Sequence, residues 1–122
     1  MIQKVVFAVS AAAAALLVAA ADRSDLEPAF HNTVVSTYPD GRQARLWLDP
    51  DGSYTAEGRK GDHTSGHWTL KGEEICLRQS SPPTLPISYC TAVPPPGGVG
   101  AVWAAKSVFG DPLKVTLVPG RS

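Results

Sequence analysis

Residues 64–79 read TSGHWTLKGEEICLRQ, and this stretch decides the fold class. Apolar side chains alternate with polar ones on both sides of Lys71-Gly72, and alternation with a period of two is typical of half-buried strands. A glycine between two such runs supplies the positive φ that a tight hairpin turn needs. The stretch therefore predicts a β-hairpin with one apolar face. The residues expected on that face are Gly66, Trp68, Leu70, Ile75 and Leu77.

The rest of the chain repeats this pattern. Beyond residue 28, the longest run without Gly or Pro is the ten residues Ala29 to Tyr38. Helices average about 11 to 12 residues and disfavour both residue types, whereas short strands suit such spacing. The expected strands are residues 32–38, 42–48, 53–58, 64–70, 73–79, 87–91, 101–106 and 113–118.

About eight antiparallel strands, each with one apolar face, must either close into a barrel or divide into two packed sheets. The short connections favour an all-β meander that closes as a small up-and-down barrel, and a two-sheet β-sandwich is the alternative. Before the strands, Ser24 and Glu27 match a capping box. Pro28 limits that helix to a turn or two, which we expect to lay Leu26 and Phe30 across an open end of the sheet.

The first 21 residues have the composition of an export signal. Lys4 is their one charge, Val5 to Val18 is an uncharged run of 14 residues, and Ala19 to Ala21 supply a small-x-small cleavage pattern before Asp22. The run is shorter than the roughly 20 residues of a spanning helix. We therefore expect a signal peptide at residues 1–21, one small domain at 22–122, no membrane span after signal removal, and a periplasmic or secreted protein.

The two cysteines fit that compartment. An even pair in an oxidising environment is more often bonded than free. Period-two alternation places Cys76 and Cys90 on the face opposite to the apolar residues of their strands, so both sulfurs share the outer face. The sequence thus predicts a Cys76–Cys90 disulfide, which closes a loop of about 15 residues.

Charge and spacing argue against several kinds of function. Residues 22–122 carry ten basic and eleven acidic groups, which does not suit a nucleic-acid binder or polybasic membrane attachment. His63 and His67 are four apart, about 13 Å in a strand and too far to ligate one metal ion. Asp62, His63 and Ser65 lie in one turn, where a nucleophile, base and orienting acid do not converge. We expect no metal, no cofactor and no enzymatic activity, and a small hydrolase is the least favoured hypothesis.

The aromatic residues divide between the two faces of the sheet. Inward aromatics could line a ligand pocket, but eight short strands enclose only about enough space for their own side chains, so a packed core is favoured. Trp47 falls on the outer face beside Arg45, a composition typical of interface hot spots, and these two form a possible partner surface. The expected core residues are Leu46, Tyr54, Trp68, Leu70, Ile75, Leu77 and Tyr89.

Four short motifs and a cysteine give the chain a resemblance to known proteins. They are Asn32-Thr33-Val34, Asp51-Gly52-Ser53-Tyr54, Gly66-His67-Trp68, Glu74-Ile75-Cys76-Leu77 and Cys90. Their order resembles a group of small exported bacterial β-proteins of unknown function. More loosely, the pattern is similar to lipocalin-like barrels and to barrel-shaped inhibitors of secreted metalloproteases. The resemblance implies export and a small barrel, and it carries over no catalytic residue.

Two functional hypotheses follow. The leading one is a non-enzymatic periplasmic or secreted barrel that binds a small ligand or an unknown protein partner. The alternative is an inhibitor of a secreted protease, which would insert residues 22–30 into an active-site cleft. Inhibition of that kind needs a free N-terminal segment, whereas a capping box predicts a docked one.

Overall fold

Eight antiparallel strands form a single sheet in the computed structural model, which describes residues 20–121. The strands are β1 (Thr33–Thr37), β2 (Gln43–Leu48), β3 (Ser53–Glu57), β4 (His63–Lys71), β5 (Glu74–Ser81), β6 (Ser88–Ala92), β7 (Val102–Lys106) and β8 (Pro112–Val118). Their bounds agree with the expected ones to within two residues, and the all-β prediction is confirmed. The predicted signal peptide lies outside the described residues except for Ala20 and Ala21.

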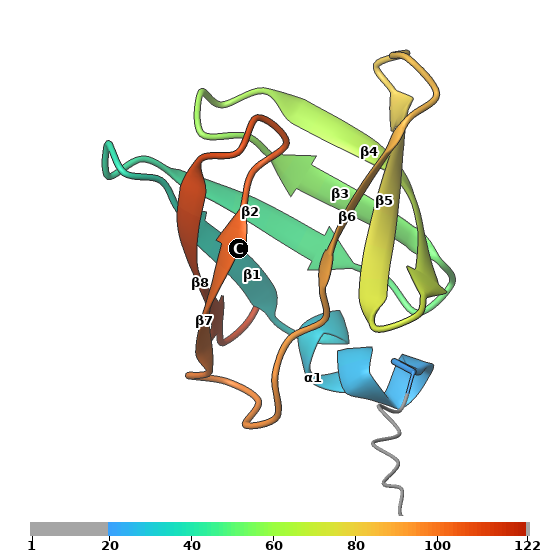
Figure 1. Ribbon diagram of the computed structural model, residues 1–122, viewed down its shortest axis with the longest axis vertical. Helices are drawn as coiled ribbons and strands as arrows, with labels where there is room; N and C mark the ends of the chain where they lie inside the picture. The colour runs from blue at the N-terminus through green and yellow to red at the C-terminus, as the bar shows by residue number, and fades with distance from the viewer. Residues whose placement is uncertain (1–19, 122) are drawn as a thin grey trace, which may run out of the picture.

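The sheet curls into a nearly closed barrel (Figure 1). The strand order is β6-β5-β4-β3-β2-β1-β8-β7, so β1 pairs with β8 and the two edge strands are β6 and β7. These edges are consecutive in the chain but do not pair. The predicted barrel is therefore confirmed over the two-sheet sandwich, and its seam lies between β6 and β7.

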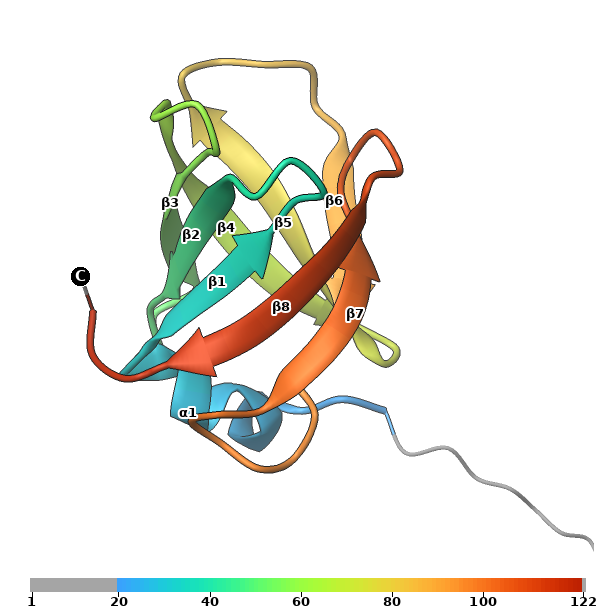
Figure 2. The same ribbon diagram turned by 90° about the vertical axis from the view of Figure 1, so that its left-hand side faces the viewer.

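The two ends of the barrel differ (Figure 2). A 3-10 helix, η1 (Arg23–Leu26), and the short helix α1 (Glu27–Phe30) lie across one end, which we call the closed end. Leu26 and Phe30 are buried there, as expected. The opposite end, the open end, carries the connections β1–β2, β3–β4, β5–β6 and β7–β8. Among residues 20–121, no helix has the length and hydropathy to cross a membrane.

The capping box lies two residues earlier than predicted. Asp22 accepts a hydrogen bond from the Ser24 backbone N–H at 2.6 Å, and Asp25 accepts one from the Asp22 N–H at 2.9 Å. Aspartate is as good an N-cap as serine, and the Ser24 hydroxyl is itself bonded to Asp22. The prediction that Ser24 and Glu27 form the capping box is therefore wrong, although the predicted helical turn is present.

Most of the core lies in the closed half of the barrel, and Leu113, near the start of β8, extends it toward the open end. Trp68 is 7% exposed, its ring centroid lies 5.9 Å from that of Phe30, and its indole N–H donates to the Asp49 carbonyl at 2.8 Å. Gly66, two residues before it, has no room for a side chain, because a Cβ there would collide with the carbonyl oxygen of Arg78. The other fully or nearly buried apolar residues of this cluster include Leu26, Ala29, Leu48, Ile75 and Leu117.

The predicted disulfide is present. Cys76 on β5 lies directly opposite Cys90 on β6, and the two sulfurs are bonded. Because β6 is an edge strand with β5 as its one partner in the sheet, the bond fastens one side of the seam to the body of the barrel.

Candidate functional site: a cavity at the open end

The open half of the barrel is hollow. A cavity of about 540 Å³ lies along the seam, between the inner faces of β3 to β5, the edge strand β6 and the end of β7, within the range of about 300 to 1,000 Å³ that is usual for small-molecule sites. The residues that line it are Tyr54, Ala56, Thr64, Leu77, Gln79, Thr84, Ile87, Ser88, Tyr89, Cys90, Lys106, Ser107 and Val108. The expectation that the strands enclose only their own side chains is therefore wrong for this half.

The sequence explains why one half is packed and the other is not. Inward positions near the closed end hold large side chains, such as Leu48, Trp68 and Ile75. Toward the open end, Ala56 on β3 is directly opposite Thr64 on β4, and both line the cavity. Two small residues on neighbouring strands leave a volume that no other side chain fills, since the barrel's diameter is fixed by its strands.

The seam forms one side of this cavity. The Tyr89 hydroxyl on β6 donates a hydrogen bond across the seam to the carbonyl oxygen of Lys106 on β7, and both residues line the cavity. A side chain thus makes the connection that a strand ladder makes elsewhere in the barrel. Tyr89, which was expected in the core, is half-buried and lies on the cavity wall.

The lining is mainly uncharged. Among residues 20–121, Lys106 is the one charged residue that lines the cavity, and no Asp, Glu or His does so. Burial raises the pKa of the Tyr54 hydroxyl above its ordinary value, so this group stays protonated at neutral pH. Among the polar groups, the Gln79 amide nitrogen donates to the Pro82 carbonyl at 2.7 Å. The Ser107 hydroxyl donates to Asp111 at 3.0 Å.

Apolar side chains surround the mouth of the cavity. Leu85 and Ile87, both in the β5–β6 connection, are 71% and 63% exposed. Val108 and Phe109, in the β7–β8 connection on the other side of the seam, are 63% and 94% exposed. Ile87 and Val108 also line the cavity. The mouth is therefore apolar on both sides, which suits the entry of an apolar molecule.

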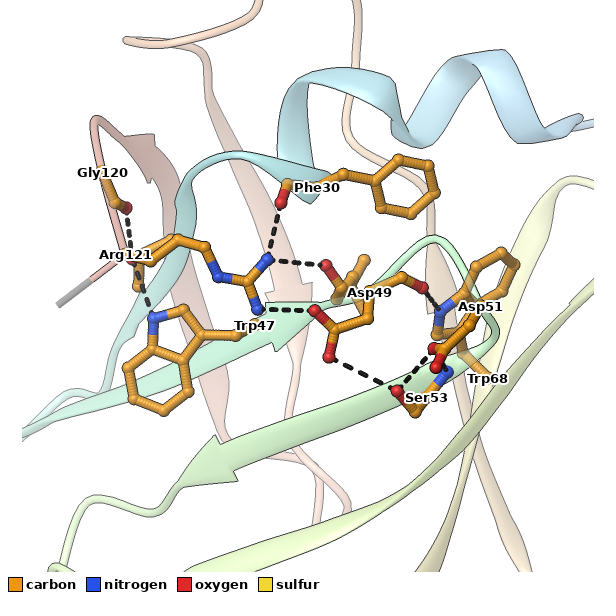
Figure 3. A network of polar contacts seen from close by, with 10 residues as sticks. Phe30, Trp47, Asp49, Asp51, Ser53, Trp68, Gly120 and Arg121 are labelled. Carbon is orange, nitrogen blue, oxygen red and sulfur yellow. Dashed lines mark hydrogen bonds and ion pairs between the residues drawn. The ribbon is translucent and has the colours of Figure 1, made fainter.

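A network of polar contacts at the closed end joins segments that are far apart in the sequence (Figure 3). The Arg121 guanidinium donates to the carbonyls of Phe30 at 2.6 Å and Leu48 at 3.1 Å, and it pairs with Asp49 at 3.0 Å. These contacts join the C-terminal segment to α1 and to the end of β2. Since Arg121 is satisfied by three protein groups, this cluster has a structural role.

Trp47 and Arg45, the predicted partner surface, lie away from the cavity on the outer face of β2. The Trp47 ring is half-buried, and its indole N–H donates to the buried Thr33 hydroxyl at 3.0 Å. The Arg45 guanidinium is 3.8 Å from the Glu57 carboxylate. The Trp47 indole and the Arg45 guanidinium thus both have protein partners. Binding of another protein at this surface remains a prediction.

The remaining candidate residues do not form a site in the part of the chain that the structure describes. His63 and His67 are exposed on β4, and the His63 ring lies 3.8 Å from the Glu57 carboxylate. Within residues 20–121, no group of three or more His, Cys, Asp or Glu residues could hold a metal ion.

Some cavity residues were not singled out from the sequence, chiefly Ala56, Thr64, Gln79 and Lys106. The available signal was the small size of the inward residues Ala56 and Thr64 on consecutive strands.

Comparisons of the chain with protein-family models, with curated proteins and with solved structures found no match. The functional argument therefore depends on the geometry of the cavity.

Proposed function

We propose that this protein is a non-enzymatic binding protein that holds a small, mainly apolar molecule in the open-end cavity. The cavity itself carries the proposal. Its volume of about 540 Å³ is that of a small-molecule site, and its apolar walls include Tyr54, Leu77, Tyr89 and Val108. Removing an apolar ligand from water into such a cavity is favourable at roughly 25 cal/mol per Å² of buried surface.

The closed end supports this proposal because its contacts hold the strands of the barrel together, so that the cavity is formed before any ligand enters. Leu26 and Phe30 fill that end, and Arg121 fastens α1 to the end of β2. A preformed pocket avoids the loss of conformational entropy that ordering a flexible one would require.

The composition of the lining supports binding over catalysis. Acid–base and nucleophilic mechanisms need a His, Asp, Glu or free Cys near the reacting atoms. The lining residues include no His, Asp or Glu, and their one cysteine, Cys90, is bonded to Cys76. Lys106 and the hydroxyl residues have no such partner in the lining.

The docked N-terminal segment weighs against the protease-inhibitor hypothesis. Leu26, Ala29 and Phe30 are at most 3% exposed, and the Arg23 guanidinium donates to the Pro50 carbonyl. Insertion of residues 22–30 into a protease would expose this apolar surface and the closed end of the core.

Export to the periplasm or outside the cell is part of the proposal. The signal-like residues 1–21 and the disulfide both favour an oxidising compartment. We expect the intact mass of the exported protein to correspond to a chain that begins at or near Asp22. A mass that still includes Met1 to Ala21 would contradict export by signal cleavage.

A cavity-filling substitution tests the binding site. Ala56→Phe places a ring inside the cavity, whereas Ala104→Phe makes the same change at an exposed position of β7. We expect wild type and Ala104→Phe to bind the fluorescent apolar probe N-phenyl-1-naphthylamine saturably. Ala56→Phe should bind it at least about tenfold more weakly, since the ring occupies the space that the ligand needs.

Thermal unfolding of both variants serves as the control for folding. Equal probe affinity in wild type and a folded Ala56→Phe would place the binding elsewhere. Failure of the wild type to bind the probe, with no ligand co-purifying by native mass spectrometry, would contradict the proposed function.

A further inference from the structure

We infer that the cavity selects an uncharged, mainly apolar molecule with one hydrogen-bonding oxygen, which the Tyr54 hydroxyl binds. This inference rests on the proposed function and adds the chemical class of the ligand to it.

The first observation concerns the partners of buried aromatic polar groups. Tyr54 is 5% exposed and lines the cavity, and no hydrogen bond among residues 20–121 includes its hydroxyl. The indole of Trp68, the other buried aromatic residue with a polar group, donates to Asp49, and two half-buried groups are also paired, the Trp47 indole with Thr33 and the Tyr89 hydroxyl with Lys106. Within residues 20–121, the half-buried Tyr38 hydroxyl and Trp103 indole have no hydrogen bond either, but neither residue lines this cavity.

Such a hydroxyl is unfavourable unless something binds it. Buried polar groups are nearly always hydrogen-bonded, because an unpaired one loses its bonds to water without replacement. Tyr54 borders a cavity large enough for a small molecule, so a ligand oxygen can supply the partner that the protein does not. The hydroxyl can donate, because a tyrosine with its ordinary pKa of about 10 is protonated at neutral pH and burial raises that pKa further.

The second observation concerns charge and depth. Tyr54 pairs with Leu48, the last residue of β2, and with Gly66, so it lies on the side of the cavity nearer the closed end. Lys106, the one charged residue among the described lining residues, is the last residue of β7 and lies at the open end, beside the β7–β8 connection. A carboxylate beside Tyr54 would be buried without a cation close to it, which is costly. A carbonyl or hydroxyl group has no such penalty.

Three nine-carbon probes of similar size separate these properties: nonan-2-one, nonane and nonanoate. By calorimetric titration, we expect the wild type to bind the ketone more tightly than either of the others. Tyr54→Phe keeps the ring and removes the hydroxyl, so it should weaken ketone binding about two- to tenfold and leave nonane binding unchanged. Tyr38→Phe is the matched control, because Tyr38 is half-buried and does not line the cavity.

Thermal unfolding of the ligand-free variants gives a second readout. Since no protein group binds the Tyr54 hydroxyl, Tyr54→Phe should unfold at the wild-type temperature or above it. A clear decrease would mean that the hydroxyl has a protein partner, and it would overturn the inference.

The other outcomes separate this inference from the proposed function. Equal affinities for ketone and nonane, or tightest binding of nonanoate, would overturn the ligand class and leave the cavity as a binding site. Saturable binding of N-phenyl-1-naphthylamine with no binding of the three probes would also overturn the ligand class and leave the cavity as a binding site. If neither the dye nor any probe binds, the proposed function fails together with the inference.

Discussion

Trp68→Ala should lower the free energy of unfolding by about 3–5 kcal/mol, the range for large aromatic truncations in packed cores. Trp68 is 7% exposed, lies against Phe30 and donates to the Asp49 carbonyl, so truncation creates a void and removes one of the two donors to that carbonyl, the other being the Gly52 N–H. Urea unfolding followed by far-UV circular dichroism measures the change.

Trp47→Ala is the matched control for this prediction, because Trp47 is half-buried on the outer face of the barrel. Its effect should be the smaller of the two, even though the indole N–H donates to Thr33. A melting temperature that hardly changes on Trp68→Ala would show that the closed half is hollow as well.

Loss of the Cys76–Cys90 bond should cost about 2–5 kcal/mol, the usual range for a small exported domain. The bond joins residues 14 apart in sequence and holds β6, which is an edge strand, against β5. The double variant Cys76→Ala/Cys90→Ala removes the bond without leaving a free thiol. Its urea midpoint can be compared with that of the oxidised wild type.

Reduction of the wild type provides the control, because it opens the bond and keeps both side chains. We expect the reduced protein and the double variant to unfold at similar urea concentrations, both below that of the oxidised wild type. Coincident midpoints for oxidised and reduced wild type would show that the bond adds nothing to stability.

Strand positions could be predicted from the sequence because local chemistry determines them. Most strands are followed by a glycine turn such as Lys71-Gly72, where Gly72 has a φ of 63°, and every strand ends within two residues of the expected place. The alternation that placed Cys76 and Cys90 on one face is likewise a property of single strands. Neither prediction depends on how the strands come together.

The seam and the cavity depend on the assembled barrel and were not predicted. Strand alternation shows that Tyr54 and Tyr89 point inward, but it does not show whether another side chain meets them. That outcome depends on the small residues Ala56 and Thr64 on neighbouring strands, and on the absence of pairing between β6 and β7. The same reason applies to Arg121, whose partners lie more than 70 residues away in the sequence.

Ligand-induced NMR shifts test the central claim, a ligand cavity confined to the open half of the barrel, most directly. Methyl and aromatic spectra should be recorded during titration with N-phenyl-1-naphthylamine. We predict saturable shifts concentrated on Tyr54, Leu77, Ile87 and Tyr89, with Trp68 and Leu117 at the closed end unaffected. Shifts centred on Trp47 and Arg45, or on the closed end with none at the cavity residues, would contradict the account.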